Sequence, residues 1–204
     1  GAGGKMTQAT TPATDAPSKN WSQTWAAALP YAEFLARHGE PKHQERWQRT
    51  YDQVALTAEQ RALIGSFTRE MHLLCVAGAW CGDCVLQCPI MEKIQEASPV
   101  VHVRYMDRDV HLDIQDQLAI NAGRRVPVTV FLAEDFEECG RFGERTLSTY
   151  RRIARDRLGP SCPTGIVPPD DAYLGAVTAD WVNEVERMQL LLRLSPRLRA
   201  KHGD

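Results

Sequence analysis

The sequence predicts an α/β fold in which a central mixed sheet is flanked by helices. A short, unbroken apolar run at residues 73–77 is typical of a strand that is buried on both faces. A helical spacing of apolar side chains follows from Val85, and residues 100–106 are rich in the β-branched side chains that favour a strand. Strand, helix and strand within this length imply a parallel pair with a right-handed crossover.

Residues 21–67 predict an N-terminal helical extension ahead of the sheet. Proline and glycine mark the helix ends, and Thr57 with Gln60 three residues later forms a capping box that opens the last of these helices. The expected helices span residues 21–38 with a break at Pro30, 41–54 and 57–67. The large aromatic side chains of this segment are interpreted as packing residues.

The remaining pattern predicts the rest of the sheet and its closing helices. Pro127 stands at the mouth of a strand, the place where a central strand tolerates proline. The expected elements are a helix over 112–120 ended by Gly123, a strand over 124–132, an antiparallel strand over 137–142, a helix capped by Ser148, a proline-rich loop over 160–169 and an amphipathic helix from Thr178.

Composition argues against several classes of protein. A net charge of −2 gives no electrostatic reason to bind nucleic acid or an anionic membrane. No apolar stretch approaches the roughly 20 residues that a bilayer crossing needs. Residues 1–5 resemble an expression remnant followed by a natural start at Met6, and residues 7–20 hold no apolar core of a signal peptide. We therefore expect a cytoplasmic protein.

The chemical centre of the sequence is a pair of cysteines, Cys81 and Cys84, between the apolar run and the helical pattern. This context places Cys81 at a helix N-terminus, where unpaired backbone N–H groups and the helix dipole favour a negative charge. In a Cys-x-x-Cys pair this can lower a thiol pKa from about 8.5 to roughly 3.5 to 7.5. The two thiols can then exchange two electrons with the disulfide of another protein.

A zinc site is the main alternative for a Cys-x-x-Cys pair. A structural zinc ion needs four ligands, and no second Cys-x-x-Cys or His-x-His cluster follows at a suitable spacing. Because the strand-then-helix context is the one that the redox motif requires, we favour redox chemistry and expect no metal.

Further markers agree with the motif in order and spacing. They are Trp80-Cys81-Gly82-Asp83-Cys84, Pro89 five residues after the second cysteine, Asp107 at the end of the next strand, Arg124-Arg125-Val126-Pro127 at the start of another and Phe142-Gly143 at the end of the hairpin. With them, residues 68–155 resemble the thioredoxin family. The motif and the following Arg108-Asp109 are most similar to a bacterial thioredoxin-like subfamily.

The resemblance implies a thioredoxin fold with an N-terminal helical extension and an extra C-terminal helix. It implies that Cys81 and Cys84 are catalytic and that Trp80, Val126 and Pro127 contact the substrate. The Val126-Pro127 bond is expected to be cis and to expose backbone that pairs with an extended peptide. Expected partners are protein disulfides or dithiols and a thioredoxin reductase-type electron donor, with no nucleic acid, membrane or cofactor.

Two departures from the family limit the resemblance. Family members commonly hold a buried carboxylate six residues before the first motif cysteine, where this sequence has Cys75. The proton of the resolving thiol must then go elsewhere, for example to water. Asp83 stands where thioredoxins have proline, and its negative charge should oppose part of the stabilisation of a thiolate at the helix end.

The other cysteines are interpreted as structural. Cys88 lies one helical turn after Cys84 and is favoured as a small buried apolar residue over an auxiliary thiol or a third metal ligand. Cys139 and Cys162 are treated in the same way, with a disulfide between them as the alternative.

These interpretations divide the chain and assign it a function. The expected parts are a disordered tag and tail (1–20), a helical extension (21–67), a thioredoxin-like domain (68–158) and a proline-rich loop with a C-terminal helix packed on that domain (159–204). The expected function is thiol–disulfide exchange by Cys81 and Cys84. The alternatives are a peroxide-reducing thiol and a non-catalytic binding module that uses the added helices as its interface.

Overall fold

The computed structural model describes residues 20–158 and 173–204. Its centre is a four-stranded mixed sheet in the order β2-β1-β3-β4, with β1 at Met71–Ala77, β2 at Val101–Asp107, β3 at Val128–Ala133 and β4 at Glu138–Gly143. The β1 strand is parallel to β2 and antiparallel to β3, and β3 is antiparallel to β4. The predicted mixed sheet, its parallel pair and its closing hairpin are therefore confirmed.

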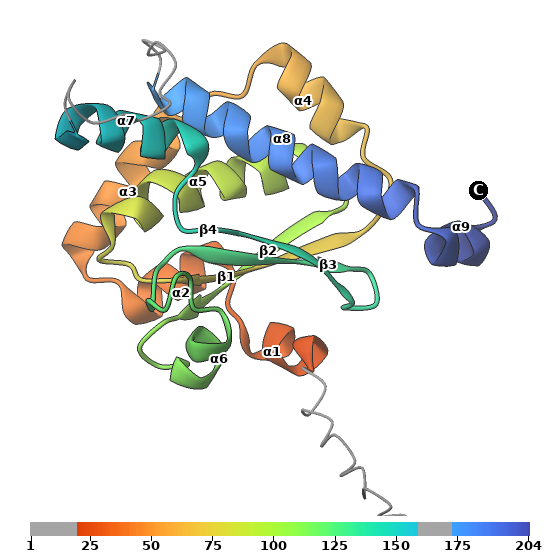
Figure 1. Cartoon of the computed structure of the whole chain (residues 1–204), viewed down its shortest axis with the longest axis horizontal. Coiled ribbons are helices and arrows are strands. Elements are labelled where there is room, and N and C mark those ends of the chain that lie inside the picture. Colours follow the sequence, from red (N-terminus) through yellow and green to blue (C-terminus); the bar gives the residue numbers. More distant parts are fainter. Residues whose placement is uncertain (1–19, 159–172) are drawn as a thin grey trace, which may run out of the picture.

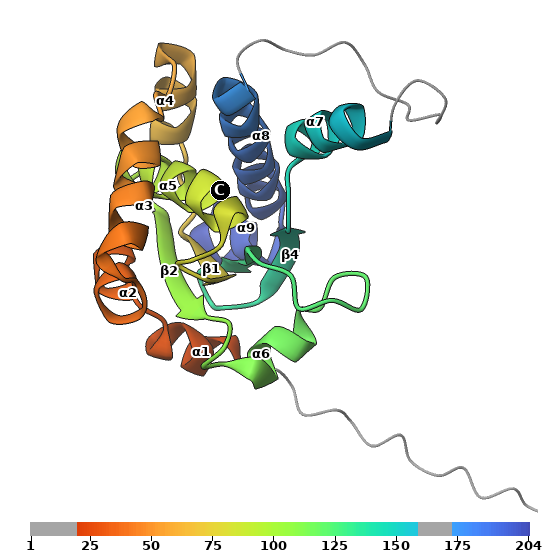
Figure 2. The same cartoon turned by 90° about the vertical axis from the view of Figure 1, so that its left-hand side faces the viewer.

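Helices cover both faces of the sheet (Figures 1 and 2). α5 and α8 lie over one face, while α1 and α6 lie over the other. The helix bounds are α1 Trp21–Ala27, α2 Tyr31–His38, α3 Pro41–Gln53, α4 Ala58–Gly65, α5 Gly82–Ala97, α6 Leu112–Gln117, α7 Leu147–Leu158, α8 Tyr173–Arg193 and α9 Pro196–His202. Within the described residues, none of these helices combines the length and the apolar character that a membrane crossing needs.

The N-terminal helices pack on the sheet and on α5. Leu29, between α1 and α2, exchanges two backbone hydrogen bonds with Tyr105 of β2. Trp47 of α3 is fully buried, and its indole N–H donates to the Ala79 carbonyl at 2.8 Å. Because Ala79 lies two residues before Cys81, the extension holds the backbone that leads into the cysteine motif. The predicted capping box of Thr57 and Gln60 is present at the start of α4.

The C-terminal helix α8 is tied to α5 and to the start of β1. Trp181 is fully buried and donates to the Gln87 side chain at 3.1 Å. Gln189 accepts from the Thr68 and Arg69 backbone N–H groups and donates to the Arg69 carbonyl. The sequence-based start at Thr178 is five residues too late, and α9 was not predicted.

Three other predictions differ from the structure. The strand expected over 124–132 begins only at Val128, after the Val126-Pro127 bond. The helix expected over 112–120 ends at Gln117, because the buried Leu118 is its C-cap and the left-handed backbone of Asn121 and Ala122 closes a turn instead. Ser148 lies inside α7, where its backbone N–H donates to Asp180, so it is not the cap. The predicted tail at residues 1–19, the loop at 160–169 and Cys162 with its alternative disulfide lie outside the described residues.

Candidate redox site

Cys81 and Cys84 lie where β1 leads into α5. Cys81 is the N-cap residue of α5 and is partly exposed, whereas Cys84 is fully buried one turn further in. Gly78 connects the strand to the motif, and its N–H lies 3.5 Å from the Cys84 sulfur. Pro89 is accommodated inside the helix rather than interrupting it. The sequence pattern thus located both cysteines at the helix end correctly.

The Cys81 and Cys84 thiols share a hydrogen bond and titrate as a unit. This contact raises the pKa of Cys81, which the backbone N–H groups of Asp83 and Cys84 partly counteract. Burial raises the pKa of Cys84, but hydrogen bonds from Cys81, Cys88 and the Gly78 N–H outweigh it and lower that pKa below its ordinary value. The pair therefore gives up its first proton readily and keeps its second.

The Val126-Pro127 segment borders the exposed sulfur. The peptide bond between these residues is cis, and the Cys81 Sγ lies 3.6 Å from the Val126 carbonyl oxygen. Gly143 of β4 packs against this edge, and a Cβ at that position would lie 2.5 Å from the Pro127 carbonyl oxygen. The close approach of the two backbones thus requires glycine at residue 143.

Trp80 forms the other side of the site. Its side chain is 44% exposed, and its ring packs so closely on Gly78 that a Cβ there would come within 2.7 Å of it. The Arg108 guanidinium lies 4.6 Å from the ring centre and also donates to the Arg124 carbonyl. The exposed Trp80 ring is therefore fixed in position by Gly78 and Arg108. Arg108 also links it to the segment that precedes Val126.

Asp83 has an ion-pair partner that the sequence pattern did not predict. Arg145, in the turn after β4, lies 3.2 Å from the Asp83 carboxylate, and it lowers the Asp83 pKa while burial raises it overall. Glu144 is buried and pairs with Arg125, and its carbonyl accepts from the Gln87 amide. Because Arg145 offsets the charge of Asp83, that carboxylate opposes a Cys81 thiolate less than the motif alone suggests.

Cys75 and Cys88 lie behind the motif. Both are fully buried, as the interpretation of Cys88 as a buried residue expected. Yet Cys88 also contacts the sulfurs of Cys75 and Cys84, so its surroundings are not purely apolar. Across the described ranges, no group of three or more His, Cys, Asp or Glu side chains is arranged to hold a metal ion.

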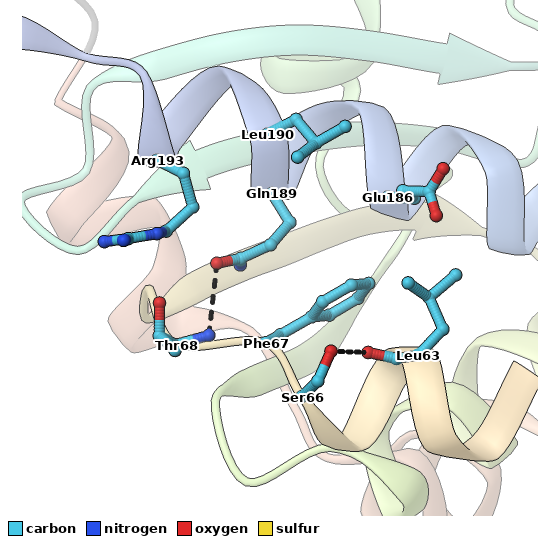
Figure 3. Close-up of a pocket in the computed structure, with 8 residues that line it drawn as sticks. All are labelled: Leu63, Ser66, Phe67, Thr68, Glu186, Gln189, Leu190 and Arg193. Atoms are coloured by element: carbon cyan, nitrogen blue, oxygen red, sulfur yellow. Dashed lines mark hydrogen bonds between the residues drawn. The ribbon is translucent and has the colours of Figure 1, made fainter.

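A separate pocket of about 310 Å³ lies between α4 and α8, at the N-terminal end of β1 (Figure 3). Its walls combine apolar side chains with one carboxylate and one guanidinium, and they contain no cysteine. The lining residues are Leu63, Ser66, Phe67, Thr68, Glu186, Gln189, Leu190 and Arg193. Since the motif follows the C-terminal end of β1, this pocket belongs to the other end of the molecule.

Comparison with known proteins identifies the fold. The solved structure of a protein of unknown function from Pseudomonas aeruginosa superposes with a TM-score of 0.66, at 20% identity, over 82% of this chain and 95% of that chain. An HIV epitope-scaffold gives 0.64, at 19% identity, over 82% of this chain and 96% of that chain. Mitochondrial thioredoxin 3 from Saccharomyces cerevisiae matches at 25% identity over 46% of this chain and 86% of that chain, with a TM-score of 0.32.

A search of curated protein sequences found no match. A sequence profile described as thioredoxin matches residues 28–154, which is more than half of the chain and includes the cysteine motif, the cis-proline edge and the hairpin. With the mixed sheet and flanking helices described above, this match shows that the chain belongs to the thioredoxin family.

Proposed function

We propose that the protein is a thiol–disulfide oxidoreductase that acts through Cys81 and Cys84. The observation that carries the proposal is the placement of a partly exposed thiol at the N-terminus of a 16-residue helix, in contact with a buried second thiol. Such a thiol is a nucleophile that other proteins can reach, and its neighbour is protected from them.

The reaction consists of two exchanges. The Cys81 thiolate attacks one sulfur of a substrate disulfide, forms a mixed disulfide and releases the other substrate sulfur as a thiolate, which takes up a proton. Cys84 then attacks Cys81, forms the Cys81–Cys84 disulfide and releases the second substrate thiol. Two electrons pass from the protein to the substrate. Electron flow in the opposite direction oxidises a substrate dithiol.

Trp80 and the Val126-Pro127 edge are proposed to orient the substrate. The first is an exposed aromatic face beside the nucleophile, and the second is backbone within contact distance of its sulfur. An extended peptide can pair with backbone at such an edge, which fits a protein substrate better than a small molecule. The proposed partners are protein disulfides or dithiols and a reductase-type electron donor, in a reducing compartment such as the cytoplasm.

Replacement of each cysteine tests this mechanism. Cys81→Ser should abolish the reduction of insulin disulfides, because no nucleophile remains at the surface. Cys84→Ser should accumulate a mixed disulfide on Cys81, which non-reducing electrophoresis detects. Cys139→Ser is the control, because this thiol lies at the turn end of the β3–β4 hairpin, the opposite end of β4 from Gly143, and disulfide reduction by this variant should be unchanged. Full activity of both motif variants would contradict the mechanism.

A second candidate is a binding module that uses the added helices. The pocket between α4 and α8 favours it, because Leu190 on its wall and Leu194 nearby are 53% and 72% exposed. A partner that binds a chain without both motif cysteines as tightly as it binds the wild type would support this candidate.

A further inference from the structure

Four cysteine side chains form a continuous file that begins at the start of α5 and ends on β1. In order they are Cys81, Cys84, Cys88 and Cys75. The Cys84 side chain neighbours those of Cys81 and Cys88, and the Cys88 side chain neighbours that of Cys75 in turn. All four are free thiols, and only Cys81 is exposed to any degree. The file therefore leads from the surface of the molecule into its core.

The register of the sheet explains why Cys75 reaches this file. Cys75 of β1 lies between Tyr105 of β2 and Thr129 of β3. The Tyr105 hydroxyl donates to the Cys88 carbonyl at 3.3 Å, and the Thr129 hydroxyl lies 3.5 Å from the Met91 sulfur. Since both neighbours face α5, Cys75 faces it as well, because side chains that are paired across strands share a face.

We propose that Cys75 and Cys88 are a second, internal dithiol, which takes over the disulfide formed at Cys81 and Cys84 and allows one chain to reduce two substrate disulfides. This inference rests on the proposed function, since it needs the first disulfide to form at Cys81 and Cys84. The fully buried Cys75 and Cys88 have no direct access to a protein substrate, so their oxidation depends on Cys84.

The transfer is two thiol–disulfide exchanges without a net gain or loss of electrons. Cys88 attacks the Cys84 sulfur of the Cys81–Cys84 disulfide, forms a Cys84–Cys88 bond and releases Cys81, which receives the proton of Cys88. Cys75 then attacks Cys88, forms the Cys75–Cys88 bond and releases Cys84, which receives the proton of Cys75. The motif is again a dithiol and can reduce a second substrate disulfide.

Geometry makes the intermediate short-lived and the transfer slow. Side chains four residues apart on a helix have Cβ atoms about 5–6 Å apart, whereas a disulfide needs about 3.5–4.5 Å, so the Cys84–Cys88 bond is strained and is readily attacked. Burial and contact with Cys75 and Cys84 raise the pKa of Cys88, so its attacking thiolate is scarce. The second substrate equivalent should therefore react more slowly than the first, and faster at higher pH.

The stoichiometry of a single reduction cycle tests the inference. A chain with Cys139 and Cys162 replaced by alanine is reduced, freed of reductant without air and mixed with an excess of a peptide closed by one disulfide. The expected result is about two peptides reduced per chain, in a fast and a slow phase. After acid quenching and alkylation, peptide mapping should find both Cys81–Cys84 and Cys75–Cys88.

Variants separate this inference from the function on which it rests. Cys75→Ala and Cys88→Ala should keep the fast phase and lose the slow one, giving about one peptide per chain. Cys81→Ser should leave Cys75 and Cys88 as thiols, and a Cys75–Cys88 bond in that variant would overturn the route through Cys84.

If the chain that lacks only Cys139 and Cys162 stops at one peptide, with Cys75 and Cys88 alkylated, the internal dithiol is overturned while the proposed function stands. A chain that reduces no peptide overturns the proposed function and the internal dithiol with it.

Discussion

The N-terminal end of α5 and the α4–α8 pocket lie at opposite ends of β1 and differ in what they offer a ligand. The pocket is a hollow of about 310 Å³ whose polar side chains include Gln189, already bonded to backbone groups of Thr68 and Arg69. The end of α5 offers an exposed edge with a partly exposed thiol. A hollow with the exposed Leu190 on its wall suits the apolar side chains of a binding partner, whereas an exposed backbone edge suits an extended peptide.

The proposed reactivity of Cys81 depends on its position at the start of a helix and not on a cavity. Cys81 caps α5, where the helix end favours a thiolate, and it lies beside Cys84, and neither feature needs a cavity. The two proposed functions, exchange chemistry and partner binding, correspond to the two regions. Substitutions confined to one region should therefore separate them.

The largest expected effect contrasts Cys81 with Leu190. Cys81→Ala should remove insulin reduction completely because the nucleophilic sulfur is lost. Leu190→Asp places a charge in the pocket wall, far from the motif, and should change kcat/KM by less than about twofold, as surface substitutions generally do. Comparable losses of activity in the two variants would show that the pocket takes part in disulfide exchange.

A second pair of variants tests the cis-proline edge through two glycines of β4. Gly143→Ala forces a Cβ to within 2.5 Å of the Pro127 carbonyl oxygen, whereas Gly140→Ala meets only the flexible end of Met188 at 3.3 Å. The backbone beside the nucleophile must shift to relieve this contact. The shift should lower the kcat/KM of Gly143→Ala about 10- to 100-fold. Gly140→Ala should stay near wild type. Steady-state kinetics on a peptide disulfide measure kcat/KM for both variants. Equal losses in the two would contradict a role of the Val126-Pro127 edge in the reaction.

The third prediction concerns stability at the two regions. Trp47→Phe leaves the buried Ala79 carbonyl without its indole donor, which should lower the free energy of unfolding by about 1–3 kcal/mol. Ser66→Ala, in the pocket wall, removes an exposed hydroxyl that donates to Leu63 and should cost less than about 0.5 kcal/mol. Urea unfolding compares the two, and a larger loss in Ser66→Ala would refute the anchoring role of α3.

The smallest effect is a pH dependence at Glu92, two turns after Cys84 on α5. Burial, and then the nearby Glu96, raise the Glu92 pKa to about 7, against 4.5 as its ordinary value. The folded state thus binds this proton more tightly than the unfolded state. The stabilisation is complete below pH 4.5 and is lost as the pH rises through 7.

Glu92→Gln should therefore gain about 1 kcal/mol over the wild type above pH 7 and little at pH 4, once solvent screening at this partly exposed site is allowed for. Unfolding curves at both pH values measure the difference. A difference that does not change with pH would contradict the raised pKa of Glu92.

Local patterns were sufficient to predict most of the fold and the core of the site. The apolar run, Gly78 and the Cys-x-x-Cys spacing act on neighbouring residues, so they predicted the β1–α5 junction correctly. Ser195 and Pro196 are the N-cap and first residue of α9, and this signal could have identified the missed helix.

Contacts between distant residues could not be read in the same way. Asp83 and Arg145 are 62 positions apart, and their pairing depends on the turn after β4. Whether Cys75 faces α5 or the opposite layer depends on strand register and on which helix covers which face. The sequence showed six cysteines but not that three of them lie buried in one file.

The central claim is that Cys81 and Cys84 interconvert as one dithiol–disulfide pair. Equilibration of a Cys75→Ala chain in glutathione buffers of graded potential, followed by acid quenching and mass mapping, tests it most directly. Both thiols should disappear together in a single two-electron transition that ends in a Cys81–Cys84 disulfide. Two thiols that persist at every potential, or a Cys81 that carries glutathione while Cys84 stays reduced, would contradict it.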